Sequence, residues 1–308
     1  MSEECPNDQV RLLIVDGHAY AYRAFFAIRK LNAPDGRATN AIYGFIKMLA
    51  RERSRARPTH ILVIWDGGLA AERMNLLPEY KAHRAEMPSD LEEQLDQIVA
   101  YLHAANIASL MKEGCEADDL IATLARQAAA AGFRVVIASS DKDFMQLASP
   151  EIELLNPNDK TGALWGVDGV ESKTGVKPTQ IVDWLSLIGD TADNIPGVPG
   201  VGPKTATDLL RQFGSIDELY RRLSDVSSDR LRVNLQKSAE LVRRNQILVR
   251  LKDDLSCGVA LEALGVRESD EESLRPLFIQ WGFRSLLHDL DTARLKRNDF
   301  FPEPTGAN

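Results

Sequence analysis

Three uninterrupted apolar runs, each followed by an aspartate, constrain the fold of this 308-residue chain more than any other feature. They lie in RLLIVDG (residues 11–17), HILVIWDG (within 60–68) and FRVVIASSDKD (133–143). Runs rich in β-branched residues, without polar alternation, predict strands that are buried on both faces, as in a parallel sheet. Helical patterns separate them, and we therefore predict an α/β domain with a mostly parallel central sheet flanked by helices. The predicted helices of this half are residues 38–57, 91–105 with Ser89 as a cap, and 117–131.

Strand signals fade after Val176, and the second half is predicted to be all-helical. Its helices are expected at residues 179–188, 204–213 and 236–251, the first two opened by prolines. We therefore divide the chain into residues 1–176, an α/β core, and residues 177–308, a helical subdomain with the C-terminal helices. A polar connection of about twenty residues (67–88) links the second strand to the next helix. Connections of that length are usually functional or mobile.

Acidic residues gather at the ends of the predicted strands. Each of the three strand-end acids could be a turn former or a helix cap, but three on three parallel strands predict a site, because ligands bind at that edge. The segments EADD, SDKD and GDTADN add six more acids, although acids in the first turn of a helix also favour the helix dipole. The nine predicted metal-binding acids are Asp16, Asp66, Glu116, Asp118, Asp119, Asp141, Asp143, Asp190 and Asp193.

An oxygen-only ligand set without His or Cys suits Mg²⁺ or Mn²⁺ rather than zinc. Because Mg²⁺ takes few direct carboxylates, nine acids imply at least two ions, and paired ions act on phosphate esters. The formal net charge is −8, from 37 Lys and Arg against 45 Asp and Glu. The nine acids account for about all of that excess, so the overall charge does not exclude a nucleic-acid partner.

The segment NIPGVPGVGPKTA (residues 194–206) predicts a phosphate-binding turn. Its glycines, Gly197, Gly200 and Gly202, permit close approach of another chain, and Pro203 opens a helix whose free N–H groups, together with Lys204, can bind a sugar–phosphate backbone. An ordinary helix–turn–helix link is the alternative. Residues 201–252 hold 11 Lys and Arg against 6 Asp and Glu, which favours non-specific contact with duplex DNA.

Inside the connection 67–88 lies EYKAHR, with Lys81 and Arg84 three residues apart. Such residues lie on one face if the segment is helical. On their own they would be solvated surface charges, but beside the strand that ends at Asp66 they are placed to reach a reacting phosphate.

The cysteines, the length of the apolar runs and the N-terminus indicate the compartment in which the protein works. Three cysteines, Cys5, Cys115 and Cys257, match no zinc pattern and leave one unpaired in any disulfide scheme. No run of 18 apolar residues occurs, and the N-terminus does not have the pattern of a secretory signal. We expect a reduced, cytoplasmic protein without a membrane partner.

With these motifs in view, the chain resembles the 5′-nuclease (flap endonuclease) family. More narrowly, it is similar to the bacterial 5′→3′ exonuclease domain found at the N-terminus of DNA polymerase I and also as a free-standing protein. The resemblance runs from about Arg11 to Leu287. It rests on VDGHAYAYRAFFA, AIYGF, the aspartate after the second strand, YKAHR, EADD, SDKD, GDTADN, PGVPGVGPKTA and WGFRSLL.

The resemblance implies a Mg²⁺- or Mn²⁺-dependent 5′→3′ exonuclease and flap endonuclease of replication and repair that leaves 5′-phosphate products. It implies two metal ions at the nine acids, with Asp16 holding a water rather than a metal. It also implies a helical arch at residues 67–88 and a helix-three-turn-helix motif at the glycine turn, with K⁺ held by backbone carbonyls, which we assign to Val198 and Val201. Lys81 and Arg84 would contact the scissile phosphate. The remaining DNA-binding residues would be Tyr22, Arg23, Arg73, Tyr80, Gly197, Gly200, Gly202 and Lys204.

The expected partner is DNA with a free 5′ end, a flap or a nick, with the RNA of RNA–DNA hybrids as a further substrate, and the expected state is a monomer associated with the nucleoid through DNA. The sequence leaves open whether the chain is a stand-alone protein or part of a polymerase, and whether exonuclease or flap cutting dominates. An RNA-directed nuclease, a catalytically silent DNA-binding module and a small-molecule phosphatase are the alternatives.

Overall fold

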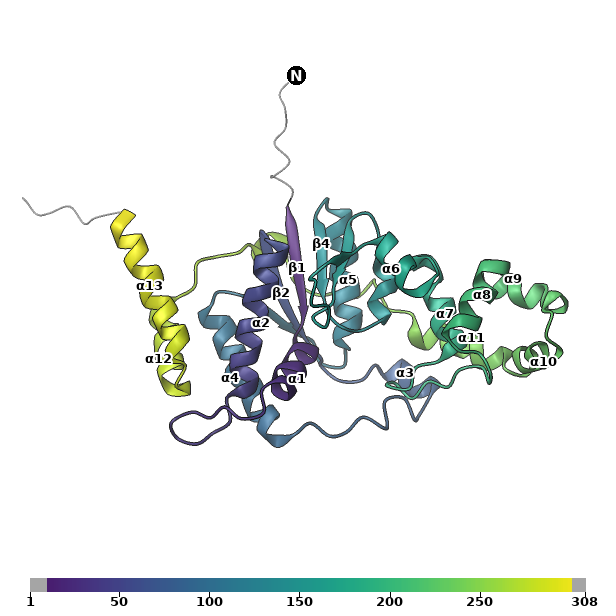
Figure 1. The fold of residues 1–308 in the computed structure, drawn as a ribbon, viewed down its shortest axis with the longest axis horizontal. Coiled ribbons are helices and arrows are strands. Elements are labelled where there is room, and N and C mark those ends of the chain that lie inside the picture. The colour runs from purple at the N-terminus through teal and green to yellow at the C-terminus, as the bar shows by residue number, and fades with distance from the viewer. Residues whose placement is uncertain (1–9, 301–308) are drawn as a thin grey trace, which may run out of the picture.

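The computed structural model describes residues 10–300; the outermost parts of the two predicted domains, residues 1–9 and 301–308, lie outside this range. One sheet stands at the centre of the described part (Figure 1). Its strands are β1 (Arg11–Asp16), β2 (His60–Trp65), β3 (Ala108–Met111), β4 (Arg134–Ala138), β5 (Ile152–Leu155) and β6 (Leu164–Trp165). Their order is β3-β2-β1-β4-β5-β6, and all neighbours are parallel except β5 and β6. The mostly parallel sheet predicted from the sequence is confirmed.

Strand β1 explains why the apolar runs are unbroken. Leu12 and Ile14 pack into a core on one face of the sheet, whereas Leu13 and Val15 pack into a second core on the other face. Because both faces are covered, every position of the strand is apolar. The chain order reverses between β1, paired with β2 on one side, and β4 on the other. In open α/β sheets that reversal point is where ligands bind.

Helices cover both faces. The first core contains residues of α5 (Ala117–Ala130), and the second contains residues of α1 (Gly17–Ala27), α2 (Asn40–Ala56) and α4 (Ser89–Ala104). Ser89 is the first residue of α4 rather than its cap, because the cap position is Pro88.

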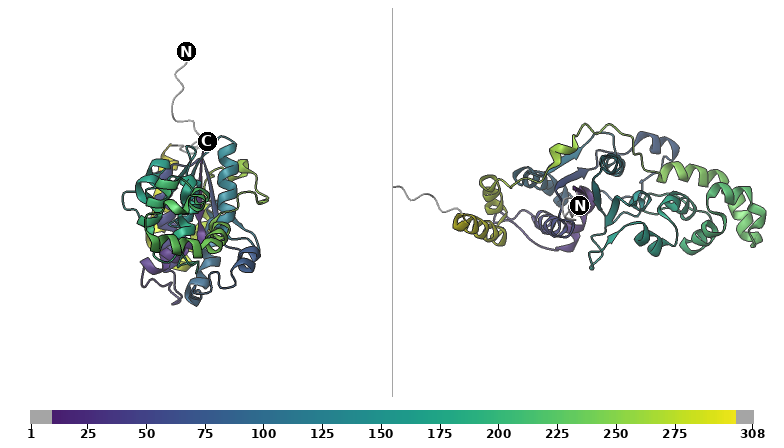
Figure 2. Two further views of the ribbon diagram at one scale, coloured as in Figure 1. Left: turned by 90° about the vertical axis from the view of Figure 1, so that its right-hand side faces the viewer. Right: turned by 90° about the horizontal axis from the view of Figure 1, so that it is seen from above.

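Seven further α-helices lie in the connection after β2 or between β6 and residue 250. They are α3 (Ala71–Leu76), α6 (Val167–Thr174), α7 (Ile181–Ile188), α8 (Pro203–Phe213), α9 (Ile216–Arg221), α10 (Asp229–Lys237) and α11 (Ala239–Val249). Short 3₁₀ helices occupy Asp143–Leu147, Pro178–Gln180, Leu223–Asp225 and Leu261–Leu264. The predicted helix 236–251 is thus two helices, which meet at Ser238. Helices α7 to α11 form a bundle at one end of an elongated molecule, as Figure 1 and the right-hand view of Figure 2 show.

The chain then returns to the α/β core. Thr59 O accepts a hydrogen bond from Val266 N, and Ala104 O accepts one from Asp270 N. Helix α12 (Glu271–Trp281) consequently packs on α4, and α13 (Arg284–Phe300) follows it. Figure 1 shows α12 and α13 at the opposite end of the molecule from α8 to α10. The sequence-based division placed both in the helical half, whereas by packing they belong with the core.

The connection 67–88, hereafter the arch segment, is helical only over α3. Residues 78–83 form turns, with Lys81 at a positive φ of 56°, so Lys81 and Arg84 do not share a regular helix. The segment runs from β2 to the neighbourhood of α11 and back to α4 (Figure 1). No helix within residues 10–300 is long and apolar enough to cross a membrane.

Candidate active site

Parallel strands bring the predicted acids together at their carboxyl edge. Asp16 is the last residue of β1, Asp66 follows β2, and Asp141 follows β4. With Asp118 from the first turn of α5, these carboxylates line a cleft of about 640 Å³. Tyr22, Arg23 and Arg84, all predicted to bind DNA or phosphate, also line it. The other residues of the cleft are His18, Ala19, Phe26, Ala27, Ala117, Ser140 and Asn158.

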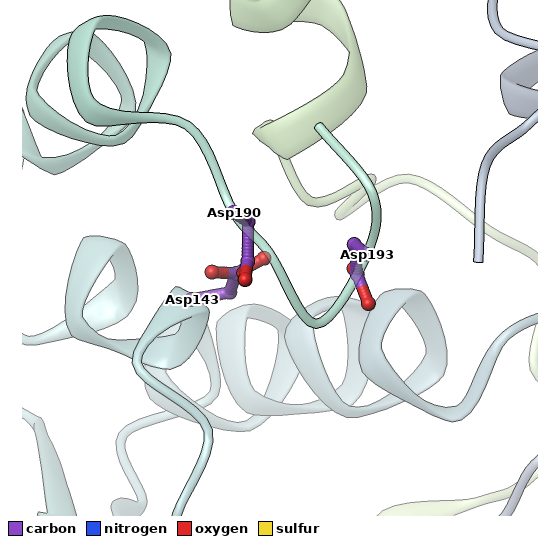
Figure 3. A group of neighbouring side chains, drawn as sticks. All are labelled: Asp143, Asp190 and Asp193. Atoms are coloured by element: carbon purple, nitrogen blue, oxygen red, sulfur yellow. The ribbon is translucent and has the colours of Figure 1, made fainter. Parts of the chain in front are cut away.

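A second group of acids, hereafter the acid group, lies next to the cleft and consists of Asp143, Asp190 and Asp193. Asp143, Asp190 and Asp193 are buried, and each offers a carboxylate oxygen that lies within 4.8 Å of the others (Figure 3). Asp143 begins the 3₁₀ helix that follows β4, while Asp190 and Asp193 come from the turn after α7. An isolated bridge between Asp190 and Ile195 fixes that turn. The core and the helical bundle therefore both supply acids to this group.

Burial and mutual repulsion raise the pKa values of four acids, which are Asp16, Asp118, Asp141 and Asp143. Burial is the main cause for Asp118 and Asp143, whose pKa values stand well above the ordinary range, and Asp141 adds to both. Burial also raises the pKa of Asp141, which the charges of Asp193 and Asp190 raise further. The pKa of Asp16 is raised to about 6, again mainly by burial. A bound cation would favour the ionised form of carboxylates so placed.

The donor set fits divalent metal ions. Asp66 Oδ1 and Asp143 Oδ1 are buried and have no hydrogen-bond partner among the described residues. Unpartnered buried carboxylate oxygens are costly unless an ion or water binds them. Because all the donors of the acid group are oxygens, hard ions such as Mg²⁺ or Mn²⁺ suit it.

Asp16 differs from the other acids of the cleft. Its Oδ1 accepts a hydrogen bond from Ala19 N at 3.0 Å, and its Oδ2 accepts one from the Ser139 hydroxyl at 2.9 Å. Both oxygens therefore have protein partners, and Asp16 also caps α1.

Three cationic side chains neutralise part of the acid group. Lys142 Nζ lies 3.3 Å from Asp190, and Arg84 donates a hydrogen bond to Asp193 at 2.7 Å. Lys81 Nζ lies 2.5 Å from Glu116 and 4.0 Å from Asp193. The side chain of Arg84 is 46% exposed, whereas Lys81 is buried. In this conformation Arg84 is open to a ligand in the cleft, and Lys81 is not.

Two predicted metal ligands are occupied by other protein groups. Both oxygens of Asp119 bind the guanidinium of Arg73, at 2.7 and 2.8 Å. Glu116 accepts hydrogen bonds from Ala70 N, Tyr80 OH and Lys81 Nζ. Although burial alone would raise it, the pKa of Glu116 is held below its ordinary value by Lys81 and Arg73. The structure does not bring Glu116 and Asp119 to the cleft.

Arg73 and Tyr80 were expected to contact DNA, yet the structure buries both, with 4% and 3% of their surface exposed. Arg73 is held by Asp119, and the Tyr80 hydroxyl donates hydrogen bonds to Glu116 and Asp193. Neither side chain is accessible to DNA in this conformation.

Sequence reasoning missed several groups around the cleft. His18 Nδ1 accepts a hydrogen bond from Asp66 N at 3.0 Å, and Asn158 accepts one from Arg23. Ser139 and Lys142 contact Asp16 and Asp190. His18, Ser139 and Lys142 stand within two residues of a predicted acid in the sequence, and that proximity was the available signal.

The glycine turn leads into α8. A side chain at Gly197 would overlap the carbonyl of Ile188, Gly200 has a positive φ of 81°, and no atom lies within 4 Å of a Cβ built at Gly202. Lys204 is exposed in the first turn of α8. The side chains of Val198 and Val201 are buried, and Val198 O accepts a hydrogen bond from Val201 N. Gly197 therefore serves packing, whereas Gly202 and Lys204 face open space.

Two family models match consecutive parts of the chain. They are "5′-3′ exonuclease, N-terminal resolvase-like domain" over residues 11–175, and "5′-3′ exonuclease, C-terminal SAM fold" over residues 176–272. The first model spans the sheet whose carboxyl edge carries the acidic cleft, and the second spans the helical bundle. The chain belongs to the 5′–3′ exonuclease family.

Several relatives with sequence similarity come from bacteria. A 5′-3′ exonuclease of Aquifex aeolicus is 36% identical over 91% of this chain and 95% of its own length. DNA polymerase I of Pseudomonas aeruginosa is 39% identical over 92% of this chain but only 31% of its own length, and that of Bacillus caldotenax is 36% identical over 92% and 32%. The chain thus spans about a third of the polymerases that it matches.

Solved structures share the fold. The T5 D15 protein co-crystallised with metal ions has a TM-score of 0.66 at 23% identity, covering 87% of this chain and 96% of its own. The catalytic core of Rad2 in complex with DNA substrate has a TM-score of 0.60 at 15% identity, covering 89% and 88%.

Proposed function

We propose that this chain is a structure-specific 5′→3′ exonuclease and flap endonuclease that hydrolyses DNA phosphodiesters at two divalent-cation sites and leaves 5′-phosphates. The observation that carries the proposal is the gathering of buried, oxygen-only ligands at the carboxyl edge of the sheet. The glycine turn beside them, which opens α8, supports a DNA backbone as the ligand. An exonuclease relative of nearly the same length supports the reaction class.

The carboxylates of the cleft and of the neighbouring acid group would hold Mg²⁺ or Mn²⁺. When bound, the ions would act as Lewis acids that stabilise negative charge on the reacting phosphate. The direct ligands that we propose are Asp66, Asp118, Asp141, Asp143, Asp190 and Asp193. Asp16, whose oxygens already have protein partners, would orient groups around the ions. Glu116 and Asp119 would hold the arch segment instead.

Arg84 and Lys81 would supply positive charge to the phosphate. Arg84 already lines the cleft and needs only to leave Asp193. Lys81 would have to leave Glu116. Cations at the acid group would repel both side chains and favour that release. Tyr22 and Arg23, which line the cleft, would hold the nucleotide beside the phosphate.

Duplex DNA would lie against the glycine turn. Gly200, Gly202 and Lys204 are the proposed contacts, and the carbonyls of Val198 and Val201 are the proposed K⁺ ligands. A nuclease core ending near residue 176 and a DNA-binding unit after it agree with the extents of the two family matches. Substrates would be nicks, flaps and free 5′ ends, and the RNA of hybrids would also be cut. We propose that the chain acts as a monomer on DNA in the bacterial cytoplasm, in replication and repair.

The variant Asp190→Asn tests the proposal. We expect cleavage of a 5′ flap in Mg²⁺ to fall by more than about 100-fold, because loss of an outer-shell partner already costs about 10–100-fold. Flap binding in EDTA should be kept. The control is Asp96→Asn, an exposed acid on α4, which should cut like the wild type. Wild-type rates in Asp190→Asn would contradict the metal assignment, and a wild type that binds flaps without cutting would point to a silent binding module.

A further inference from the structure

Arg73 is the most heavily bonded side chain of the arch segment. It lies in α3 and is 4% exposed. Its two terminal nitrogens donate to the two oxygens of Asp119, a bidentate geometry that only a guanidinium provides. Nε donates to Leu248 O at 3.0 Å, and a terminal nitrogen donates to Arg250 O at 3.1 Å. One side chain thus joins α3, α5 and the end of α11.

The partners of Arg73 are themselves tied together. Asp119 Oδ1 also accepts a hydrogen bond from Lys252 N at 2.9 Å. Glu116 Oε1 lies 3.2 Å from Arg73 and accepts a hydrogen bond from Ala70 N, the residue before α3. The residue before α3 and Arg73 within it therefore both bind acids at the start of α5, and one of these acids also binds the chain after α11.

The acids of the EADD motif that bind Arg73 differ from the acid that reaches the cleft. Residues three apart on a helix lie on one side of it, and Arg73 binds Glu116 and Asp119 there. Asp118 lies between them in the sequence and points in another direction. Of the three, only Asp118 lines the cleft.

We propose that Arg73 and Asp119 are positioning residues rather than a DNA contact and a metal ligand. Their buried ion pair fixes the first turn of α5, so that Asp118 faces the cleft. The ion pair also connects the arch segment to residues 248–252, which form the end of α11 and the chain just after it. The inference rests on the proposed function of the cleft, but its test does not require cleavage.

The test uses the full chain with Arg73→Met, Asp119→Asn and the double variant, and Ca²⁺ as the probe in calorimetric titrations. We expect each single variant to lower Ca²⁺ affinity about 10–100-fold, the usual effect of losing an outer-shell partner. The double variant should lose no more than either single variant. It should also melt at a higher temperature than Arg73→Met, in which a buried carboxylate has lost its partner.

The matched control is Arg126→Met, which removes the exposed ion pair between α5 and Asp253. It should leave Ca²⁺ affinity and melting temperature unchanged, since exposed ion pairs contribute little. If Asp119→Asn weakens Ca²⁺ binding as strongly in Arg73→Met as in the wild type, Asp119 is a metal ligand and the proposal is overturned.

A DNA contact by Arg73 is tested by the salt dependence of duplex binding in EDTA. The binding constant K falls as salt rises, and loss of one phosphate contact makes the slope of log K against log salt less steep by about 1. We expect Arg73→Met to keep the wild-type slope, and a less steep slope would overturn the proposal. If Arg73→Met does not fold, Arg73→Lys replaces it, because it keeps the charge but not the fork. Wild-type Ca²⁺ affinity in Arg73→Lys would also overturn the proposal. A wild type that binds Ca²⁺ but cuts no DNA would refute the proposed function and leave the positioning result standing.

Discussion

At the scale of single residues, the buried acids of the cleft and of the neighbouring acid group lower the stability of the fold. Burial and neighbouring carboxylates raise the pKa values of Asp118 and Asp143, and Asp143 Oδ1 has no partner among the described groups. Lys142 and Arg84 offset part of this repulsion. Such strain is retained where function requires it.

Asp143→Asn should therefore stabilise the metal-free protein. Because Asn has no charge to bury and no proton to take up on folding, the free energy of unfolding in EDTA should rise by about 0.5–2 kcal/mol, as measured by urea denaturation. The same variant should gain less stability than the wild type when Mg²⁺ is added, because a ligand has been lost. Asp96→Asn should change neither value. A destabilised Asp143→Asn in EDTA would mean that the group is not repulsive.

The pKa of Asp16 gives a pH test. Because its pKa rises from 3.8 to about 6 on folding, ionised Asp16 disfavours the folded state. That penalty is absent below about pH 4 and complete above about pH 7. The stability of Asp16→Asn relative to the wild type, in EDTA, should therefore be greater at pH 7 than at pH 4. A difference that is independent of pH would show that Asp16 is not so perturbed.

The sequence indicated most of the acids but not their partners. Strand ends locate Asp16, Asp66 and Asp141, because parallel strands end at one edge. No spacing shows that Asp119 binds Arg73, which lies 46 residues earlier in the chain. Only the tertiary fold separates the acids of the cleft from those that hold the arch segment.

At the scale of elements, Gly197 and Gly202, the two outer glycines of the turn, differ in how closely other atoms surround them. A methyl group at Gly197 would meet the Ile188 carbonyl at the end of α7, beside the loop that carries Asp190 and Asp193. Asn245 of α11 also holds this loop, by hydrogen bonds to Ser186 O and Pro196 O. Gly202 has open space around it.

We therefore expect Gly197→Ala to destabilise the protein by about 1–3 kcal/mol, the usual cost of overpacking, and to weaken Mg²⁺ binding. Gly202→Ala should unfold like the wild type, yet bind duplex DNA more weakly if the backbone lies against phosphate. Urea denaturation and a DNA-binding titration distinguish the two. Equal stabilities of both variants would contradict the packing described here.

Long buried elements could be predicted from the sequence, and short ones could not. β1, β2 and β4 show continuous apolar runs, whereas β3 is four residues long with alternating exposure and β6 has two residues. Residues 236–251 were predicted to be one helix, whereas the structure has two helices, 229–237 and 239–249, which meet at Ser238. That α12 packs on α4 depends on the path of residues 251–270, which carries no pattern.

At the scale of the whole molecule, negative and positive charge gather in different parts of the chain. The net charge of −8 would repel DNA if it were evenly spread. Four acids, Asp16, Asp66, Asp118 and Asp141, instead line the cleft at one edge of the sheet, where cations would neutralise them, while residues 201–252 have a net positive charge. In the function proposed above, DNA would lie along the helical bundle, and Figure 1 shows α12 and α13 at the opposite end of the molecule from α8 to α10.

The most direct measurement is cleavage of two 5′-labelled substrates, a flap duplex and a plain recessed duplex, each in Mg²⁺ and in EDTA. The account predicts metal-dependent cutting near the flap junction, with 5′-phosphate on the shortened strand, and no cutting of either substrate in EDTA. Binding of both substrates without any cutting in Mg²⁺ would contradict it, because the carboxylate group would then have no catalytic role.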